Sequence, residues 1–326
     1  MSQQVNYLET VGDVLRWHNG RMQQLRVLSA DRKRCIRGAL DAQLLPALGS
    51  VLVADLNRRT VERELIFPMQ AAYSLAYVRK IWNVLASAFR RCVEAEFIEY
   101  NPLASVTFGS FRLGELLPRE TNLLPANAAD VLNLFNCEYP FDPRAGAFGL
   151  LLLLFGTRQG ETRKAKWSDF KLDEGVWIIP AVDTKTRKRH ELPLTDFALG
   201  FLRRYKANCL ENEIRSRYLF WGIGDDCMGA EAARYIVKRI SDGNWHAHDI
   251  RKMVRASWAT LGVDFLIGEL LLNHSVGVVA KTYLQCDLTA PKLLALEVWH
   301  AKLKELLCPT GTPGVNPVTQ PLRAFR

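Results

Sequence analysis

The spacing of apolar residues changes from helical to alternating once along this chain, between residues 167 and 194. The segment "WSDFKLDEGVWIIP" predicts a strand, a tight turn containing Gly175, and a second strand. "TKTRKRHELPL" then predicts a basic turn and a third short strand. On both sides of this stretch apolar residues recur at helical spacing. The pattern therefore predicts a mainly α fold with one small antiparallel β-sheet.

The first hundred residues predict a helical domain. Apolar residues recur at helical spacing over 10–28, and Ser29 is a plausible N-cap for the helix after it. A long amphipathic helix is predicted over 72–98, and it ends before Pro102, which disfavours helix at the preceding residue. Further helices are predicted at about 126–136, 145–155, 196–208, 230–240, 249–261, 264–272 and 292–307.

A chain of 326 residues exceeds what one compact core usually serves, so two domains are expected. Residues 107–121 lack clear periodicity and contain two glycines and a proline, which places the boundary there. We expect a helical domain over 1–107, a linker over 108–121 and a second, α+β domain over 122–307. The tail, 308–326, is rich in proline, glycine and threonine and is expected to be flexible.

The net charge of +9 suits a polyanionic partner, either nucleic acid or an anionic membrane. The longest apolar run, "FGLLLLLFG", is too short to span a bilayer, and the N-terminus lacks the pattern of a signal peptide. We therefore expect a cytoplasmic protein without a membrane partner. The seven cysteines form no CxxC pair, which argues against a zinc ribbon and a disulfide framework.

Two clusters in the second domain present cations. "FGTRQGE" holds Arg158 just after a predicted buried helix, and Glu161, three residues on, could orient either Arg158 or a neighbouring helix. Arg158 is either a guanidinium directed at a site or a surface arginine at a helix end. "TKTRKRH" holds Lys185 at the tip of the predicted hairpin, as a mobile cation or as part of a solvated turn.

Two more clusters follow toward the C-terminus. In "HAHDIRKMVRASW", His248 and Arg251 share one helical face. A metal site built on the HxH pair lacks carboxylate or cysteine ligands at suitable spacing, and a phosphate site fits the arginine better. "LLLNHSVGVVAKTYLQ" holds His274 and, nine residues later, Tyr283. Either residue alone would be interpreted as structural.

Taken together, these motifs closely resemble the tyrosine recombinase, or phage integrase, family. The order is an arginine in "GTRQGE", a hairpin lysine, "HDIR", "NHS" and "KTY". The resemblance covers about 121–300 strongly and the N-terminal helices, similar to the family's core-binding domain, more weakly. Asn273 departs from the family's glycine, but asparagine also suits a left-handed helix end. No predicted reactive position is lost, so we expect an active enzyme.

The resemblance implies a site-specific recombinase, an integrase that cuts and rejoins DNA. Tyr283 would attack the phosphodiester and form a 3′-phosphotyrosyl link, and strand exchange would pass through a Holliday junction. No carboxylate cluster suited to Mg²⁺ is visible, so we expect no metal and no other cofactor. The predicted catalytic residues are Arg158, Lys185, His248, Arg251, His274 and Tyr283.

The expected partner is double-stranded DNA carrying paired recombination sites. The resemblance implies a homo-tetramer on DNA, a monomer or weak oligomer when free, association with the nucleoid, and a role in a phage or genomic island. An accessory directionality factor is a further candidate partner. DNA contacts are predicted from Arg79, Lys80, Arg90, Arg91, Arg187 and Lys188, each of which could equally belong to a solvated face.

Several alternatives stay open from the sequence. A Xer-like resolvase, a type IB topoisomerase-like enzyme and a catalytically silent DNA-binding regulator would share much of this pattern. The last helix carries an apolar stripe over 290–307. The family suggests that this segment docks on a neighbouring protomer, and the alternative is that it packs within its own domain.

Overall fold

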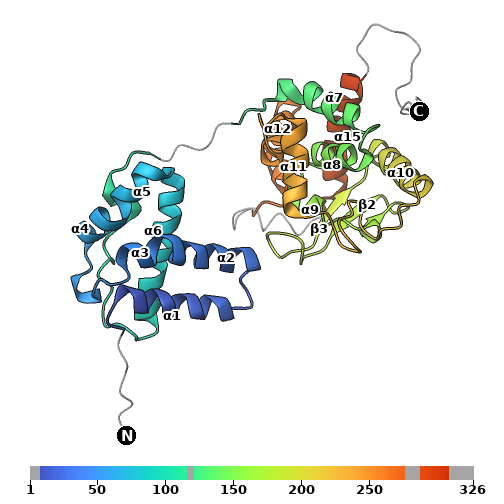
Figure 1. Cartoon of the computed structure of the whole chain (residues 1–326). Helices are drawn as coiled ribbons and strands as arrows, with labels where there is room; N and C mark the ends of the chain where they lie inside the picture. The colour runs from blue at the N-terminus through green and yellow to red at the C-terminus, as the bar shows by residue number, and fades with distance from the viewer. Residues whose placement is uncertain (1–7, 116–120, 276–286, 308–326) are drawn as a thin grey trace. The chain divides into compact units, whose positions relative to one another are not determined.

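The computed structural model describes residues 8–115, 121–275 and 287–307 (Figure 1). The chain divides into two compact units, residues 1–119 and 120–326. The first unit is helical, and the second combines helices with a small sheet (Figure 1). This confirms the mainly α fold expected from the sequence. In the described ranges, no helix is both long enough and apolar enough to cross a membrane.

The first unit packs short helices around one long amphipathic helix. This helix, α6 (Leu75–Glu94), contributes a buried stripe that includes Val78, Ile81, Leu85 and Phe89. Short π-helical stretches lie at Leu40–Leu44 and Glu62–Ile66. The helices are α1 (Val11–Gln24), α2 (Ala30–Ala39), α3 (Leu45–Leu48), α4 (Arg58–Val61), α5 (Phe67–Ala72) and α6 (Leu75–Glu94).

The long helix predicted over 72–98 is wrong in its boundaries. It begins only at Leu75, because Tyr73 and Ser74 have extended backbone conformations, and it ends at Glu94. The division between the two units, at residues 119 and 120, lies within the linker predicted over 108–121. Phe111, at the start of that stretch, is buried in the core of the first unit, with its ring 5.0 Å from that of Trp82.

The second unit surrounds a three-stranded antiparallel sheet with helices. Strands β1 (Phe170–Lys171), β2 (Val176–Ile179) and β3 (His190–Pro193) lie in the order β1-β2-β3. Trp177 pairs with Leu192, and both side chains are fully buried. The helices are α7 (Ala128–Glu138), α8 (Pro143–Phe155), α9 (Gln159–Thr162), α10 (Asp196–Glu211), α11 (Ala230–Ile240), α12 (Ala247–Thr260), α13 (Phe265–Leu271) and α15 (Thr289–Leu307).

Helix α8 forms the centre of this core. Its sequence, "PRAGAFGLLLLLF", is apolar around nearly its whole circumference, as expected for a helix that is buried on all sides. Two glycines allow close packing, because a Cβ at Gly149 would lie 1.9 Å from the ring of Phe135, on α7. The end of α8 at Phe155 leads directly into the predicted active-site arginine.

Helix α15 packs against α8 in the same unit. Leu296, Trp299 and Leu303 are buried in the core, and the Trp299 indole donates to the Leu153 carbonyl at 3.0 Å. The apolar stripe predicted for the last helix is therefore used within its own unit. This is the arrangement expected if the helix packs within its own domain.

Candidate active site

Helix α13 ends in a turn whose backbone depends on Asn273. This residue has a φ of 52°, a left-handed conformation that asparagine adopts more readily than most residues other than glycine. The Asn273 amide donates to the Leu270 carbonyl, and the His274 amide donates to the Glu269 carbonyl, each at 3.0 Å. These bonds form a Schellman motif, which fixes the position of His274. The left-handed helix end predicted from the sequence is confirmed.

Arg251 lies on α12, and backbone carbonyls hold its guanidinium in place. The residue is only 4% exposed. Its Nη1 donates to the Gly156 carbonyl at 2.7 Å, and its Nη2 donates to the Leu272 carbonyl. Burial, together with the charge of nearby Arg158, lowers the pKa of Arg251 to about 10. The guanidinium therefore stays charged at neutral pH, in a position that favours a bound anion.

Arg158 is held beside Arg251 by the same turn. Its Nη2 donates to the Asn273 carbonyl at 3.3 Å, next to the Leu272 carbonyl that Arg251 binds. Glu161 accepts from the Arg158 amide at 3.0 Å and from Nη1 at 2.8 Å. Of the two orienting roles that the sequence left open for Glu161, the structure shows the contact with Arg158. The two guanidiniums thus converge on consecutive residues of one turn.

His274 is oriented by a carboxylate that the sequence analysis missed. Its Nδ1 lies 2.6 Å from Oε2 of Glu269, and Nε of Arg255 donates to Oε1 of Glu269 at 2.7 Å. Since the carboxylate accepts, Nδ1 carries a proton and Nε2 faces away from it. The Arg255 guanidinium also lies over the ring of Phe265. A glutamate five residues before a histidine has no recognised motif spacing.

His248 occupies an exposed position near the start of α12. Its pKa is lowered, first by the partial burial of the ring and then by the neighbouring cations Lys252, Arg251 and Arg158. It is therefore neutral at pH 7 and can accept a proton. No three His, Cys, Asp or Glu side chains in the described ranges are grouped in a way that could hold a metal ion.

Of the two remaining predicted catalytic residues, Lys185 is among the described residues and Tyr283 is not. Lys185 lies in the loop between β2 and β3, where its side chain is exposed. The next residue, Thr186, donates to Oδ1 of Asn273 at 3.1 Å, so this loop reaches the turn that binds the arginines. Tyr283 lies outside the described residues. The described chain thus brings Arg158, Arg251, His274 and the Lys185 loop to one turn.

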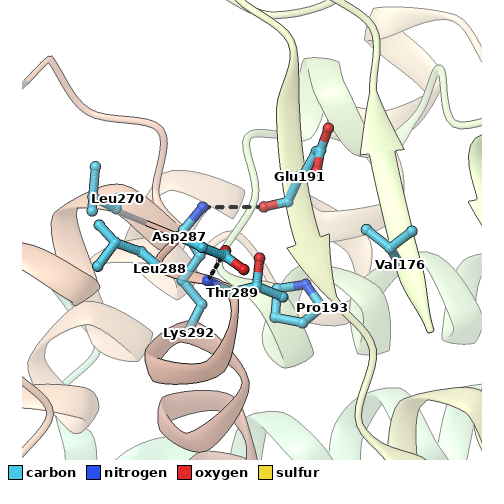
Figure 2. A pocket seen from close by; sticks show the side chains of 8 residues that line it. All are labelled: Val176, Glu191, Pro193, Leu270, Asp287, Leu288, Thr289 and Lys292. Carbon is cyan, nitrogen blue, oxygen red and sulfur yellow. Dashed lines mark hydrogen bonds between the residues drawn. The ribbon is translucent and has the colours of Figure 1, made fainter. Parts of the chain in front are cut away.

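A pocket of about 220 Å³ lies where α15 begins, between β2, β3 and the end of α13 (Figure 2). The amine of Lys292 donates to the Glu191 carbonyl at 3.4 Å, and Asp287 accepts from the Thr289 amide at 2.9 Å (Figure 2). The described residues that line it include none of the predicted catalytic residues. The Lys292 contact instead joins the start of α15 to β3, and the Asp287 contact lies within the segment that leads into this helix.

The predicted DNA-contact residues differ in how exposed their side chains are and in the partners they already have. Arg79 and Lys80 are exposed on α6, whereas Arg90 lies 3.8 Å from Glu94 of the same helix. Arg91 is partly covered, and its Nε is buried without a hydrogen-bond partner in the described structure. On the second unit, the exposed cations of the Lys185 loop include Arg187 and Lys188.

The match to a known protein family lies in the second unit. The sequence model of the phage integrase family matches residues 123–288. Prophage integrase IntZ of Escherichia coli (strain K12) is 25% identical over 177 residues, which cover 51% of this chain and 40% of that protein. Prophage integrase IntA of the same strain is 23% identical over 172 residues, covering 52% and 40%. The match thus spans about two fifths of the length of these relatives.

Solved structures of integrases share the fold. A lambda integrase tetramer bound to a Holliday junction superposes with a TM-score of 0.66 at 16% identity, covering 85% of this chain and 78% of that one. The Tn1549 transposon integrase in complex with circular intermediate DNA gives a TM-score of 0.64 at 14% identity, covering 85% and 95%. At this level of identity the likeness concerns the fold alone.

Proposed function

Because the chain belongs to the phage integrase family, we propose that it is a site-specific DNA recombinase. Its reaction is the transfer of a DNA phosphodiester to Tyr283 and then to the 5′ hydroxyl of a second strand. Two such exchanges, through a Holliday junction, integrate or excise a mobile element such as a phage or a genomic island. The catalytic set is Arg158, Lys185, His248, Arg251, His274 and Tyr283.

The observation that carries this proposal is the convergence of two guanidiniums on one turn. Arg251 and Arg158 bind the carbonyls of Leu272 and Asn273, so backbone geometry fixes both cations before any substrate arrives. A phosphodiester under attack gains negative charge on its non-bridging oxygens. A fixed donor aimed at such charge typically contributes about 3 to 4 kcal/mol to transition-state stabilisation. His274, oriented by Glu269, supplies a third donor beside them.

The nucleophile needs a base nearby. A tyrosine with a pKa of about 10 is ionised in only about one molecule in a thousand at pH 7, a penalty of roughly 4 kcal/mol. His248 suits the role of base because its lowered pKa keeps the imidazole neutral at that pH. The same cations that lower the pKa of His248 favour the phenolate form of a nearby tyrosine.

Departure of the 5′ oxygen completes the first step. Lys185, on the exposed loop, protonates this oxygen as its bond to phosphorus breaks. The bond energy is retained in the 3′-phosphotyrosyl link, so a second 5′ hydroxyl can reverse the reaction without ATP.

The substrate is double-stranded DNA with paired recombination sites. We propose that four copies assemble on it, as in the lambda integrase tetramer on a Holliday junction. Arg79 and Lys80 of the first unit, with Arg187 and Lys188 of the second, are exposed candidates for phosphate contact. Affinity should fall steeply with salt concentration as these cations release counterions. A nucleoid location and an accessory directionality factor belong to the same proposal.

The test is a covalent adduct formed on selected DNA. The full chain is incubated with a pool of nicked duplexes whose randomised sequence spans the nick, and adducts that resist denaturation are recovered and sequenced. We expect the wild type to enrich a defined site. Tyr283→Phe should bind that site with unchanged affinity and give no adduct. Adduct formation by Tyr283→Phe would refute the assignment of the nucleophile.

The same selected site separates the alternatives. A plasmid carrying two copies should be recombined by the proposed enzyme, whereas a type IB topoisomerase-like enzyme would only relax its supercoils. A silent DNA-binding regulator would bind the site without forming an adduct. A Xer-like resolvase would favour resolving two sites on one molecule over joining two molecules.

A further inference from the structure

A hydrogen bond between side chains joins the Lys185 loop to the active-site turn. The Thr186 hydroxyl donates to Oδ1 of Asn273 at 3.1 Å, although 87 positions separate the two residues. Lys185 immediately precedes Thr186, and His274 immediately follows Asn273. The bond therefore connects the chain neighbours of two proposed catalytic residues.

The rest of the loop is braced internally and at its start. Thr184 is buried, and its hydroxyl accepts from the Lys188 amide at 3.1 Å and donates to the Lys188 carbonyl at 2.8 Å. Lys164 pairs with Asp183 at 3.1 Å, where the loop begins. These contacts give the loop its shape. At the far end of the loop, the His190 ring lies 3.1 Å from the Leu271 carbonyl, one residue before the arginine-binding turn. Thr186 makes the described contact between the middle of the loop, beside Lys185, and that turn.

An asparagine at position 273 costs the folded protein some stability. Glycine would satisfy the left-handed backbone of this turn with less strain. The Nδ2 group of Asn273 is buried and has no hydrogen-bond partner in the described structure, which is destabilising. Within the described residues, the compensating polar contact of this side chain is the bond from Thr186 to Oδ1. The value of asparagine here therefore lies in holding the loop.

We propose that Asn273 is a positioning residue for Lys185. Through Thr186 it holds the lysine loop against the turn that binds the two arginines. Lys185 makes no hydrogen bond or ion pair with any described residue, so the loop determines how often its ammonium reaches the reacting phosphate.

The inference rests on the proposed function, in which Lys185 is the general acid. In that step the bond between phosphorus and the Tyr283 oxygen forms as the bond between phosphorus and the 5′ oxygen breaks. The tyrosine proton passes to His248, and the lysine proton passes to the departing oxygen. A loop that drifts from the turn would delay the transfer of the lysine proton and leave the other steps intact.

Three variants isolate this contact. Asn273→Gly keeps the backbone conformation and removes the acceptor, and Thr186→Val removes the donor at nearly constant shape. Thr186→Ser retains a hydroxyl and is the matched control. We expect the first two to slow cleavage of the selected duplex by about 2- to 10-fold, the range expected from one net hydrogen bond. The control should cleave at nearly the wild-type rate, and all three should bind the duplex equally well.

A second substrate distinguishes positioning of the general acid from general damage. The selected duplex is synthesised with sulfur in place of the bridging 5′ oxygen. A thiol has a pKa of about 8.5, so a thiolate leaves without needing a proton. We expect Asn273→Gly, Thr186→Val and Lys185→Ala to cleave the sulfur duplex at rates close to that of the wild type.

The outcomes separate this inference from the function on which it rests. If the wild type forms no adduct on any DNA, the proposed function fails. The positioning inference alone is overturned if the sulfur duplex restores cleavage by Lys185→Ala, but Asn273→Gly and Thr186→Val cleave the ordinary oxygen duplex as fast as the wild type does. It is also overturned if those two variants are equally slow on both duplexes.

Discussion

The buried histidines of the second unit should make its stability depend on pH, and His300 gives the clearest case. His300 is 1% exposed, its Nε2 lies 3.0 Å from the Leu154 carbonyl, and its Nδ1 lies 2.6 Å from the Thr195 hydroxyl. A carbonyl can only accept, so Nε2 carries the proton and Nδ1 accepts from Thr195. A second proton on the ring would break this arrangement, and burial lowers the pKa of His300 to about 4.

The sign and size of the effect follow from linkage. The folded pKa is depressed, so below the unfolded pKa of about 6.5 the unfolded chain binds a proton that the folded chain does not. The stability that this neutral ring contributes is fully present above pH 6.5 and is lost as the pH falls toward 4. Between pH 7 and pH 5 this histidine should lower the free energy of unfolding by about 2 kcal/mol. His190, whose pKa is also lowered to about 4 by burial, should contribute a similar loss.

The assay is urea unfolding followed by tryptophan fluorescence at pH 7 and pH 5. His300→Gln can still donate to Leu154 and accept from Thr195, but it does not titrate. Its loss of stability between the two pH values should be smaller than that of the wild type by about 2 kcal/mol. His190→Gln should behave in the same way, because its ring lies 3.1 Å from the Leu271 carbonyl. An undiminished pH dependence in both variants would refute the reasoning.

Two further predictions concern orientation and packing. Glu269→Gln keeps the shape beside His274 but removes the carboxylate, so DNA cleavage should slow by about 10-fold or more with unchanged binding. The adduct assay measures the rate of cleavage and a gel-shift titration measures binding, and an unaltered rate would contradict the orienting role. Gly149→Ala should destabilise the second unit by at least about 1 to 3 kcal/mol in urea unfolding, because its Cβ would lie 1.9 Å from Phe135. Gly200→Ala is the control: its Cβ would meet nothing within 4 Å, and it should stabilise helix α10 by up to about 1 kcal/mol.

The sequence predicted those features that are encoded locally. The change of apolar spacing located the three strands, and helix α11 begins and ends where its pattern does, at Ala230 and Ile240. The left-handed end of α13 was predicted because a single residue, Asn273, determines that backbone conformation. In each case the physical cause lies within a few residues of the effect.

Features that depend on distant contacts could not be predicted in the same way. The break at Tyr73 and Ser74 contains neither glycine nor proline, so nothing local distinguished it from continuous helix. The pairing of Arg255 with Glu269 requires knowing how α12 lies against α13. An apolar stripe likewise indicates that a helix face is covered, but it does not identify the surface that covers it. For α15 the sequence therefore left open both packing within its own domain and docking on a neighbouring protomer.

The turn at 272–274 explains why the predicted residues, scattered along the sequence, can act as one site. Leu272 and Asn273 offer their carbonyls to the two arginines, Asn273 offers its side chain to the lysine loop, and His274 follows at once. A single Schellman motif therefore sets the relative positions of groups from α12, the end of α8 and the β2–β3 loop. Errors in this turn would displace all of them together. The cost of an asparagine with a buried, unpaired amide is reasonable at such a point, because here one side chain can influence the whole constellation.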